Sequence, residues 1–567
     1  MAAWQIFPKI PDDFKNQFPE INPIILQLLW NRGLRNQKEI DEFLLPDYSQ
    51  DLHDPFLFKA MNGAVERIKK AIDNGEKITI YGDYDADGVC ATAILYLTLE
   101  KMGANLSYYL PDREKEGYGL NKDGVKKIID EGTKLIITVD CGITNIEEID
   151  FINDFGVEII VTDHHIPLEN LPKALFIINP WVKDETYPFK NLAGSGVAFK
   201  LSQALLKKIP IANNREAFEK WLLDLVAVGS VADLVPLVGE NRTLVKYGLV
   251  VLNKTPRPGL RHLIKIAGIN LGELDTRSIG FQIASRLNAA GRVDHANLSL
   301  EMILTKEVKK AQSLAEKLHK LNELRQKKME TIFNEVKEKV GETPTDKIII
   351  AYKENWPIGV LGLVSHKLTE TYNRPSILMT IRDYEIKGVG RSIEEFNLIE
   401  NLKEVEEFFV RYGGHAGAAG FTLKEKNLDL LKDFCEKIKK IADHKLKESD
   451  IREKILIDSE INLEEITWQF YEEIIKFEPF GEENPLPIFL AKNLVIEQIE
   501  KIGKNSQHLK LIVSGGKKML YFGQGERINH FQVGDKIDVV FILGESEWKG
   551  TREMEFKILD LKKHESN

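Results

Sequence analysis

The sequence predicts an α/β protein with two α/β lobes joined by a long helix, followed by a C-terminal β-barrel of the OB type. In the first lobe, apolar β-branched runs alternate with segments of helical character, the pattern of βαβ units in a mainly parallel sheet. In the tail, short strands are separated by glycine turns, the pattern of a small barrel. The apolar runs of the first lobe end at Tyr81, Leu110, Asp140, Asp163 and Asn179.

Five segments follow from these patterns. A helical N-terminal segment comes first, and the parallel-sheet lobe follows it. A helical connector, with a long basic helix expected over 306–338, leads to a second α/β lobe that begins near the apolar run Lys347–Ile350. The predicted boundaries are 1–75, 76–255, 256–342, 343–448 and 449–567.

Composition and charge exclude several classes of protein. The hydrophobic fraction of 43% and the charged fraction of 29% are those of an ordinary globular protein. The N-terminal residues lack the regions of a signal peptide, and no uncharged apolar run approaches the ~20 residues that span a bilayer. Cys90, Cys141 and Cys435 show no paired spacing, so we expect reduced thiols in a cytoplasmic protein. The net charge of −10 argues weakly against non-specific binding to polyanions.

Carboxylates gather directly after the first apolar run. Asp83, Asp85 and Asp87 alternate there, and in an extended segment residues i, i+2 and i+4 face the same way. Three close carboxylates repel each other unless cations lie between them. The run also resembles the start of a calcium loop, but Ile94 stands where such a loop needs glutamate. A solvated acidic turn is the competing interpretation, and the residues described next weaken it.

Further metal-ligating side chains occupy comparable positions. Asp140 ends one apolar run, and Asp163, His164 and His165 end another. Asp233 lies in an apolar helical segment, where by itself it would be a helix cap. Because the carboxyl ends of parallel strands meet at one edge of a sheet, we expect these side chains to converge. Carboxylate oxygens mixed with imidazole suit Mg²⁺ or Mn²⁺, and two such ions close together cleave phosphate esters.

A basic segment at 306–328 lies between the two lobes in the sequence. It contains eight Lys and Arg residues against three Glu residues. One interpretation is a solvated helix face, and the other is a track for the phosphates of DNA. Its position between two phosphate-handling lobes favours the track.

The ordered motifs of the chain resemble those of a known superfamily. Asp-Ala-Asp-Gly at 85–88, Val-Asp-Cys-Gly at 139–142 and Thr-Asp-His-His at 162–165 resemble the DHH phosphoesterases. Other motifs resemble the RecJ branch of that superfamily, the bacterial single-strand-specific exonucleases. These motifs are Leu110–Arg113, Gly117–Leu120, Gly229–Pro236, Arg286–Arg292 and Gly413–Phe421.

The resemblance implies roles for the residues at matching positions. It implies two Mn²⁺ or Mg²⁺ ions bridged by Asp140, in-line attack of activated water on phosphorus, and contact of His165 with the scissile phosphate. The implied metal ligands are Asp83, Asp85, Asp87, Asp140, His164 and Asp233. The implied catalytic residues are Asp140, Asp163 and His165, and the implied phosphate-binding residues are Arg113, Arg286, Asn288, Arg292, Arg391, Ser392 and His415.

The resemblance also implies an activity. It implies a 5′-to-3′ exonuclease of DNA repair and recombination that releases 5′-mononucleotides from single-stranded DNA. It further implies a monomer, with a helicase and a single-strand-binding protein as partners. A sister-branch phosphodiesterase for short oligonucleotides or cyclic dinucleotides is the alternative, which the OB-like tail and the basic connector oppose. A third hypothesis is a DHH protein that has lost its metal ligands and serves as a structural partner of a helicase. The complete set of metal ligands in this chain opposes it.

The chain departs from the RecJ pattern at two positions. Trp356 is followed by Pro357 where the family has histidine, so we assign no role there. Ser285 precedes Arg286 where the family has proline, a change that concerns the local backbone and leaves the role of the arginine unaltered.

Overall fold

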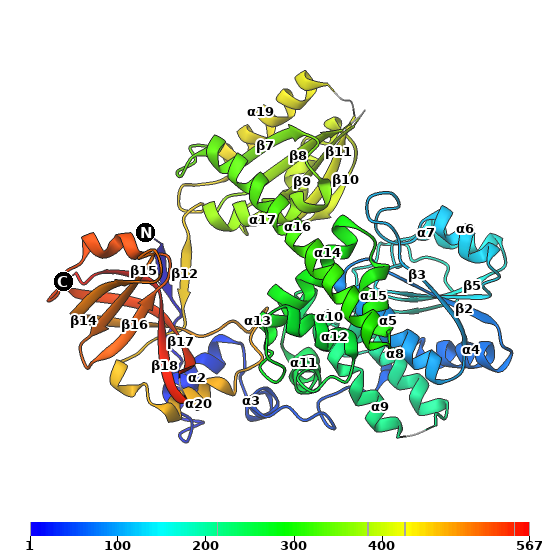
Figure 1. The fold of residues 1–567 in the computed structure, drawn as a ribbon, viewed down its shortest axis with the longest axis horizontal. Coiled ribbons are helices and arrows are strands. Elements are labelled where there is room, and N and C mark those ends of the chain that lie inside the picture. Colours follow the sequence, from blue (N-terminus) through cyan, green and yellow to red (C-terminus); the bar gives the residue numbers. More distant parts are fainter. Residues whose placement is uncertain (1, 213, 383–384, 425–426, 549, 566–567) are drawn as a thin grey trace. The chain divides into compact units, whose positions relative to one another are not determined.

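The computed structural model describes residues 2–212, 214–382, 385–424, 427–548 and 550–565, and Figure 1 shows the fold. The chain forms two compact units. The smaller unit consists of Met1–Leu52, Pro236–Lys246 and Glu453–Asn567, and the larger unit consists of His53–Val235 and Tyr247–Arg452. No helix in the described ranges is both long enough and apolar enough to cross a membrane.

The first lobe of the larger unit is built on a five-stranded sheet in the order β3-β2-β4-β5-β6, and all its strand pairs are parallel. Gly82, Val139 and Thr162 are in register, so β2, β4 and β5 end at the same edge. The strands are β2 (Lys77–Gly82), β3 (Asn105–Tyr109), β4 (Leu135–Val139), β5 (Glu158–Thr162) and β6 (Phe176–Ile178). The helices are α4 (Met61–Asp73), α5 (Ala86–Lys101), α6 (Lys122–Asp130), α7 (Ile146–Asp154) and α8 (Gly194–Lys208), after a short 3₁₀ helix at Pro55–Leu57. The predicted parallel α/β lobe is confirmed.

Helices connect this sheet to the second one. The longest, α16 (Val308–Val340), packs against α12, α14, α15 and α17, and it is the long helix that the sequence predicts. Its buried face carries residues 311, 315, 318, 322 and 325, a spacing of four and three that marks one side of a helix. The other helices are α9 (Arg215–Trp221), α10 (Leu223–Ala232), α11 (Gly239–Leu252), α12 (Pro258–Ile266), α13 (Thr276–Ser278), a π-helix at Ile279–Ala284, α14 (Ser285–Val293) and α15 (Asn297–Leu304).

The second lobe has a mixed sheet in the order β10-β11-β9-β8-β7, in which only β7 and β8 are parallel. Phe409, Phe421 and Phe434 pack against each other in its core. The strands are β7 (Ile349–Glu354), β8 (Ser376–Arg382), β9 (Glu385–Arg391), β10 (Phe409–His415) and β11 (Ala418–Leu423). The helices are α17 (Ile358–Tyr372), α18 (Leu398–Lys403), α19 (Leu428–Lys445) and a 3₁₀ turn at Glu406–Phe408.

The smaller unit contains the barrel that the tail predicts. Strands β14, β15, β16, β18 and β17 pair in that order, and β17 pairs again with β14, which closes the ring. The strands are β1 (Ala3–Ile6), β12 (Lys454–Ile457), β13 (Ser459–Glu460), β14 (Ile488–Ile502), β15 (His508–Val513), β16 (Lys517–Tyr521), β17 (Lys536–Trp548) and β18 (Thr551–Lys563). The helices are α1 (Asp12–Lys15), α2 (Pro23–Asn31), α3 (Gln37–Leu44), α20 (Trp468–Ile475) and 3₁₀ turns at Leu463–Glu465 and Gly525–His530.

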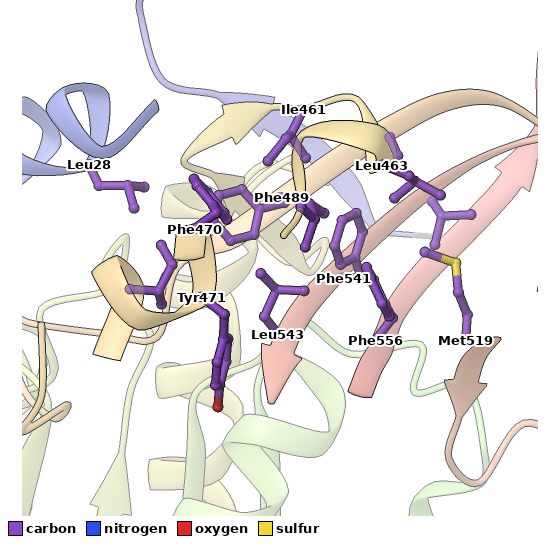
Figure 2. Close-up of a cluster of buried hydrophobic side chains, with 14 of the residues drawn as sticks. Leu28, Ile461, Leu463, Phe470, Tyr471, Phe489, Met519, Phe541, Leu543 and Phe556 are labelled. Carbon is purple, nitrogen blue, oxygen red and sulfur yellow. The ribbon is translucent and has the colours of Figure 1, made fainter. Parts of the chain in front are cut away.

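One apolar core holds the smaller unit together. Phe489 and Phe541 of the barrel lie in one cluster with Phe470 of α20, and Figure 2 shows these rings close together. Leu28 of α2 belongs to the same cluster. The N-terminal helices therefore pack with the C-terminal barrel in one unit. The predicted segments 1–75 and 449–567 treat them as separate.

Arg242 explains why the segment 236–246 belongs to the smaller unit. Its side chain is 1% exposed, and its guanidinium lies 3.9 Å from the centre of the Phe43 ring. The guanidinium donates hydrogen bonds of 2.7–2.9 Å to the carbonyl oxygens of Phe43, Lys476, Phe477 and Glu478. A single buried side chain thus joins all three segments of this unit.

Candidate metal centre

Three aspartates follow three neighbouring strands at one edge of the parallel sheet. Asp83 follows β2, Asp140 follows β4 and Asp163 follows β5, and all three are buried. Asp140 adopts a left-handed backbone with φ of 61°, which costs a non-glycine residue about 1–3 kcal/mol and is common at functional sites. Its N–H donates to the carbonyl oxygen of Thr162 at 3.1 Å. A Cβ added at Gly194 would lie 2.5 Å from the Asp140 Cβ, so a glycine there permits this close approach.

Asp85 and Asp87 reach the site by a different geometry from the predicted one. The extended segment expected over 83–87 is wrong, because α5 begins at Ala86. Asp85 caps this helix and accepts hydrogen bonds from the N–H groups of Asp87 and Gly88 at 2.9 and 3.0 Å. Aspartate is a favoured N-cap, so local capping outcompetes an extended backbone here. Asp87 therefore points into the site from the first turn of a helix.

The start of α8 fixes Asp87. Its two carboxylate oxygens accept hydrogen bonds from the N–H groups of Gly194 at 2.6 Å and Ser195 at 3.1 Å. The free N–H groups at a helix N-terminus favour an anion at this position. The Asp87 carboxylate is therefore held in one place by a neighbouring helix.

His164 and Asp233 complete the cluster. Nε2 of His164 lies 3.0 Å from Oδ1 of Asp140 and 3.6 Å from Oδ2 of Asp233. Asp233 is the C-cap residue of α10, so the cap interpretation is correct and its carboxylate still faces the cluster. In three overlapping sets, one ligand atom from each residue lies within 4.8 Å of the others. The sets are Asp83, Asp85 and Asp140; Asp87, His164 and Asp233; and Asp140, His164 and His165.

The electrostatics of the cluster fit bound divalent cations. Oδ1 of Asp83, Oδ1 of Asp140 and Nε2 of His164 are buried and form no hydrogen bond with any residue that the structure describes. Burial and repulsion between the carboxylates raise the pKa of Asp87 to about 6 and hold the pKa values of Asp83, Asp140 and Asp233 well above the usual range. Burial lowers the pKa of His164 to about 4, so its imidazole is neutral, as a metal ligand must be. Carboxylates with one imidazole are the donor set for Mn²⁺ or Mg²⁺.

Asp163 is the exception among the strand-end carboxylates. Its Oδ1 accepts from the N–H groups of His164 and His165 and lies 2.7 Å from Nδ1 of His165. Its Oδ2 accepts from the N–H of Ile143 at 3.0 Å. Burial opposes ionisation of Asp163, but the bond to His165 outweighs it, so the pKa of Asp163 lies below its usual range. Burial likewise opposes protonation of His165, but Asp163 raises its pKa to about 9. Asp163 therefore orients His165.

Arginines lie beside the carboxylate cluster. The Arg113 guanidinium lies 4.9 Å from the centre of the Tyr84 ring, and Nη1 of Arg292 donates to the carbonyl oxygen of Gly359 at 3.0 Å. Burial lowers the pKa of Arg292 to about 9, and repulsion from Arg113 adds to this shift. Burial and Arg113 also lower the pKa of Arg391. Within the described ranges none of these guanidiniums forms an ion pair with a carboxylate.

A second arginine pair joins a predicted phosphate-binding residue, Arg286, to Arg325 of the predicted DNA track. Arg286 of α14 donates a hydrogen bond from Nε to Nδ1 of His319 at 3.2 Å. Burial lowers the pKa of Arg325 on α16, and repulsion from the charge of Arg286 lowers it further. Nε of Arg325 and Oδ1 of Asn322 are buried and have no hydrogen-bond partner among the described residues. The sequence held a signal for both, because 322 and 325 are polar residues at positions where the stripe of α16 is otherwise apolar. Three of the seven lysines of the predicted DNA track, Lys306, Lys310 and Lys317, form ion pairs with acidic residues.

Three other predicted phosphate-binding residues occupy distinct places. Oδ1 of Asn288 accepts a hydrogen bond from the N–H of Ala86 at 2.8 Å, which ties α14 to the start of α5. Ser392 follows β9 and donates from its hydroxyl to the carbonyl oxygen of Phe396 at 2.5 Å. His415 is exposed at the end of β10. In the described part of the chain, no hydrogen bond or ion pair joins His415 to another predicted site residue.

Tyr118 lies in the motif Gly117–Leu120 but is not among the predicted site residues. The Tyr118 hydroxyl lies 3.0 Å from Nδ1 of His165 and donates toward the carbonyl oxygen of Asp140 at 3.3 Å. A tyrosine between two glycines, Gly117 and Gly119, was the available signal.

Comparisons with known proteins cover all three folded regions. The model of the DHH family N-terminal domain matches residues 77–230, that of the DHHA1 domain matches 345–443, and that of the RecJ OB domain matches 457–560. The single-stranded-DNA-specific exonuclease RecJ of Bacillus subtilis is 38% identical over 98% of this chain and 70% of that protein. The RecJ of Escherichia coli K12 is 32% identical over 88% of each chain.

Solved structures agree with these matches. The crystal structure of RecJ from Thermus thermophilus in complex with Mn²⁺ superposes with a TM-score of 0.84, at 30% identity, over 100% of this chain and 80% of that chain. The same protein in complex with Mg²⁺ superposes with a TM-score of 0.79 at 28% identity. The parallel-sheet lobe, the second lobe and the barrel of this chain thus have a counterpart of known structure.

Proposed function

Because the chain belongs to the RecJ family of DHH phosphoesterases, we propose that it is a metal-dependent exonuclease that hydrolyses single-stranded DNA. The observation that carries the proposal is the buried cluster of carboxylates and imidazole beside Arg113, Arg292 and Arg391, which form no ion pair with a carboxylate of the described residues. Buried arginines without acidic partners are suited to phosphate groups, which their planar fork binds in pairs of hydrogen bonds.

The metal ligands would come from two halves of the cluster. Asp83, Asp85 and Asp140 form one set, and Asp87, His164 and Asp233 form another. Asp140 lies beside both sets, because its Oδ1 is 3.0 Å from Nε2 of His164, which supports a bridging role. When bound, two Mn²⁺ or Mg²⁺ ions would activate water for attack on phosphorus and stabilise the charge on the leaving oxygen.

The other residues would bind and orient the DNA strand. His165, held by Asp163, would present its ring to the scissile phosphate, and its position beside the cluster supports this role. Arg113, Arg292 and Arg391 would neutralise phosphates next to the metal ions. Arg286 would bind a phosphate further along the strand, and Arg325 would assist it.

The direction of degradation and the partners are finer parts of the proposal. We propose 5′-to-3′ polarity with release of 5′-mononucleotides, action as a monomer, and cooperation with a helicase and a single-strand-binding protein. The family resemblance supports these features, and the exonuclease names of the relatives support the class of substrate.

A degradation assay tests the proposal directly. Single-stranded oligonucleotides labelled at the 5′ or the 3′ end are incubated with the protein and Mn²⁺, with duplex DNA and a cyclic dinucleotide as controls. We expect the 5′-labelled strand to release labelled mononucleotide at once. Duplex DNA and the cyclic dinucleotide should not be cleaved, and the Asp83→Asn protein should be inactive. Release first from the 3′ end would contradict the polarity. Cleavage of the cyclic dinucleotide alone would move the protein to the sister branch.

A further inference from the structure

The loop that carries Tyr118 is fixed in one conformation. Gly117 and Gly119 flank the tyrosine with φ values of 84° and 80°, in the left-handed region that glycine tolerates best. A Cβ added at Gly119 would lie 2.5 Å from Oδ1 of Asn145. Asn145 exchanges two hydrogen bonds with the backbone of Leu120, at 3.2 and 3.3 Å. The loop is therefore anchored to the start of α7 immediately after Tyr118.

The Tyr118 hydroxyl joins two groups of the metal centre. Its oxygen lies 3.0 Å from Nδ1 of His165 and 3.3 Å from the carbonyl oxygen of Asp140. Oδ1 of Asp163 accepts the backbone N–H groups of His164 and His165 and lies 2.7 Å from Nδ1 of His165, so a proton on Nδ1 faces both Asp163 and Tyr118. The tyrosine oxygen can then share the hydrogen bond from this N–H with Asp163, while its own O–H donates to the carbonyl oxygen of Asp140.

This arrangement constrains the imidazole from a second side. Asp163 is two residues from His165 in the chain, so it restrains the ring only locally, whereas Tyr118 connects it to the main chain after β4. The two rings meet edge to face, with centroids 5.5 Å apart and planes at 68°. The Tyr118 side chain is 43% exposed, so its ring supports little of the core while its hydroxyl points to the site.

We propose that Tyr118 is a positioning residue that acts through His165. Its hydroxyl ties the imidazole to the backbone of Asp140 and so leaves Nε2 directed to the scissile phosphate. The inference deepens the proposed function and depends on it only for the identity of the group that meets Nε2. The position of the ring itself is independent of the substrate.

Substitution Tyr118→Phe removes the hydroxyl and keeps the ring. We expect kcat on a single-stranded oligonucleotide to fall about tenfold, as for other residues that orient the groups at a metal site, with KM changed less than about twofold. The Kd for Mn²⁺, from isothermal titration calorimetry, should change much less than kcat, because the Tyr118 hydroxyl meets the main-chain carbonyl of Asp140 and not a carboxylate that binds the metal. The matched control is Tyr108→Phe, on β3 of the same sheet, where Tyr108 meets the Tyr96 ring edge-on at 5.9 Å.

A spectroscopic readout separates this inference from the proposed function. In Mg²⁺-loaded protein with ¹⁵N-labelled histidine, the Nδ1–H of His165 is assigned by its loss in His165→Gln. We expect Tyr118→Phe to shift this resonance or to speed its exchange with water, and Tyr108→Phe to leave it unchanged.

Three results would overturn the positioning role. Any one of them suffices: an Nδ1–H resonance that Tyr118→Phe leaves unaltered, a kcat that it leaves unaltered, or an affinity for Mn²⁺ that it weakens tenfold. The last result would place the effect of the substitution at Asp140. A wild-type protein inactive on single-stranded DNA would refute the proposed function alone, and the resonance would still decide the role of Tyr118.

Discussion

A methyl group added at Gly229 displaces a proposed metal ligand without removing it. Gly229 lies in α10, and a Cβ there would stand 2.3 Å from Oδ1 of Asp87 and 2.3 Å from Oγ of Ser195. Ordinary contact begins at 3.4 Å, so the Asp87 carboxylate must move by about 1 Å. It cannot simply turn aside, because the N–H groups of Gly194 and Ser195 hold both its oxygens.

The magnitude follows from that displacement. A misplacement of 1 Å at a reacting centre costs about 100-fold in rate, so we expect kcat of Gly229→Ala to fall by about that factor. Overpacking costs roughly 1–3 kcal/mol, and replacing a helical glycine by alanine returns about 0.5–1 kcal/mol. The free energy of unfolding in EDTA should therefore fall by no more than about 2.5 kcal/mol.

The assay combines metal binding with turnover. Isothermal titration with Mn²⁺ should show at least one site weakened about 10- to 100-fold, and the end-labelled oligonucleotide should report the loss in kcat. The control is Gly280→Ala in the π-helix, where the added Cβ meets only Val231, at 3.8 Å. A Gly229→Ala protein that binds Mn²⁺ and turns over like the wild type would refute the assignment of Asp87 as a ligand.

Three further predictions concern charge and burial. Because carboxylates repel each other in the metal-free cluster, Mn²⁺ at 100 times its Kd should raise the free energy of unfolding by about 2.7 kcal/mol for each site; equal thermal stability with Mn²⁺ and with EDTA would count against the site. Arg325→Met removes a buried cation that repels Arg286, so we expect stability unchanged within about 1 kcal/mol and KM for oligonucleotides raised about tenfold or more; steady-state kinetics that give the wild-type KM would contradict a phosphate contact. Arg242→Met removes the donor from four carbonyl oxygens, through two buried and two partly buried hydrogen bonds, and should lower the free energy of unfolding by at least about 3 kcal/mol; an unchanged midpoint of urea denaturation would show that these bonds contribute little.

The strand-end residues of the site could be predicted because sheet geometry is regular. Once β2, β4 and β5 are recognised as neighbouring parallel strands, Asp83, Asp140 and Asp163 must lie at one edge. The division of labour among them could not be predicted. Asp163 differs from the other two only because nearby N–H groups occupy both its oxygens, and those bonds depend on the turn after β5.

The remaining features depend on contacts between distant segments. Asp87 is fixed by α8, more than a hundred residues away, and Tyr118 reaches His165 only because Gly117 and Gly119 turn the loop. Arg325 was visible within a basic segment, but its burial follows from the way α16 packs against α14. Periodicity within one segment carries no information on such pairings.

The three-segment composition of the smaller unit has a consequence for synthesis of the chain. Residues up to Leu52 emerge from the ribosome first, but apart from the short segment Pro236–Lys246 the rest of their unit begins at Glu453, roughly 400 residues later. At about 5–20 residues per second, the N-terminal helices wait some 20–80 s for it. During that interval the apolar faces of Phe14, Leu28 and Phe43 have no barrel to pack against. These helices are therefore the part of the nascent chain most in need of a chaperone.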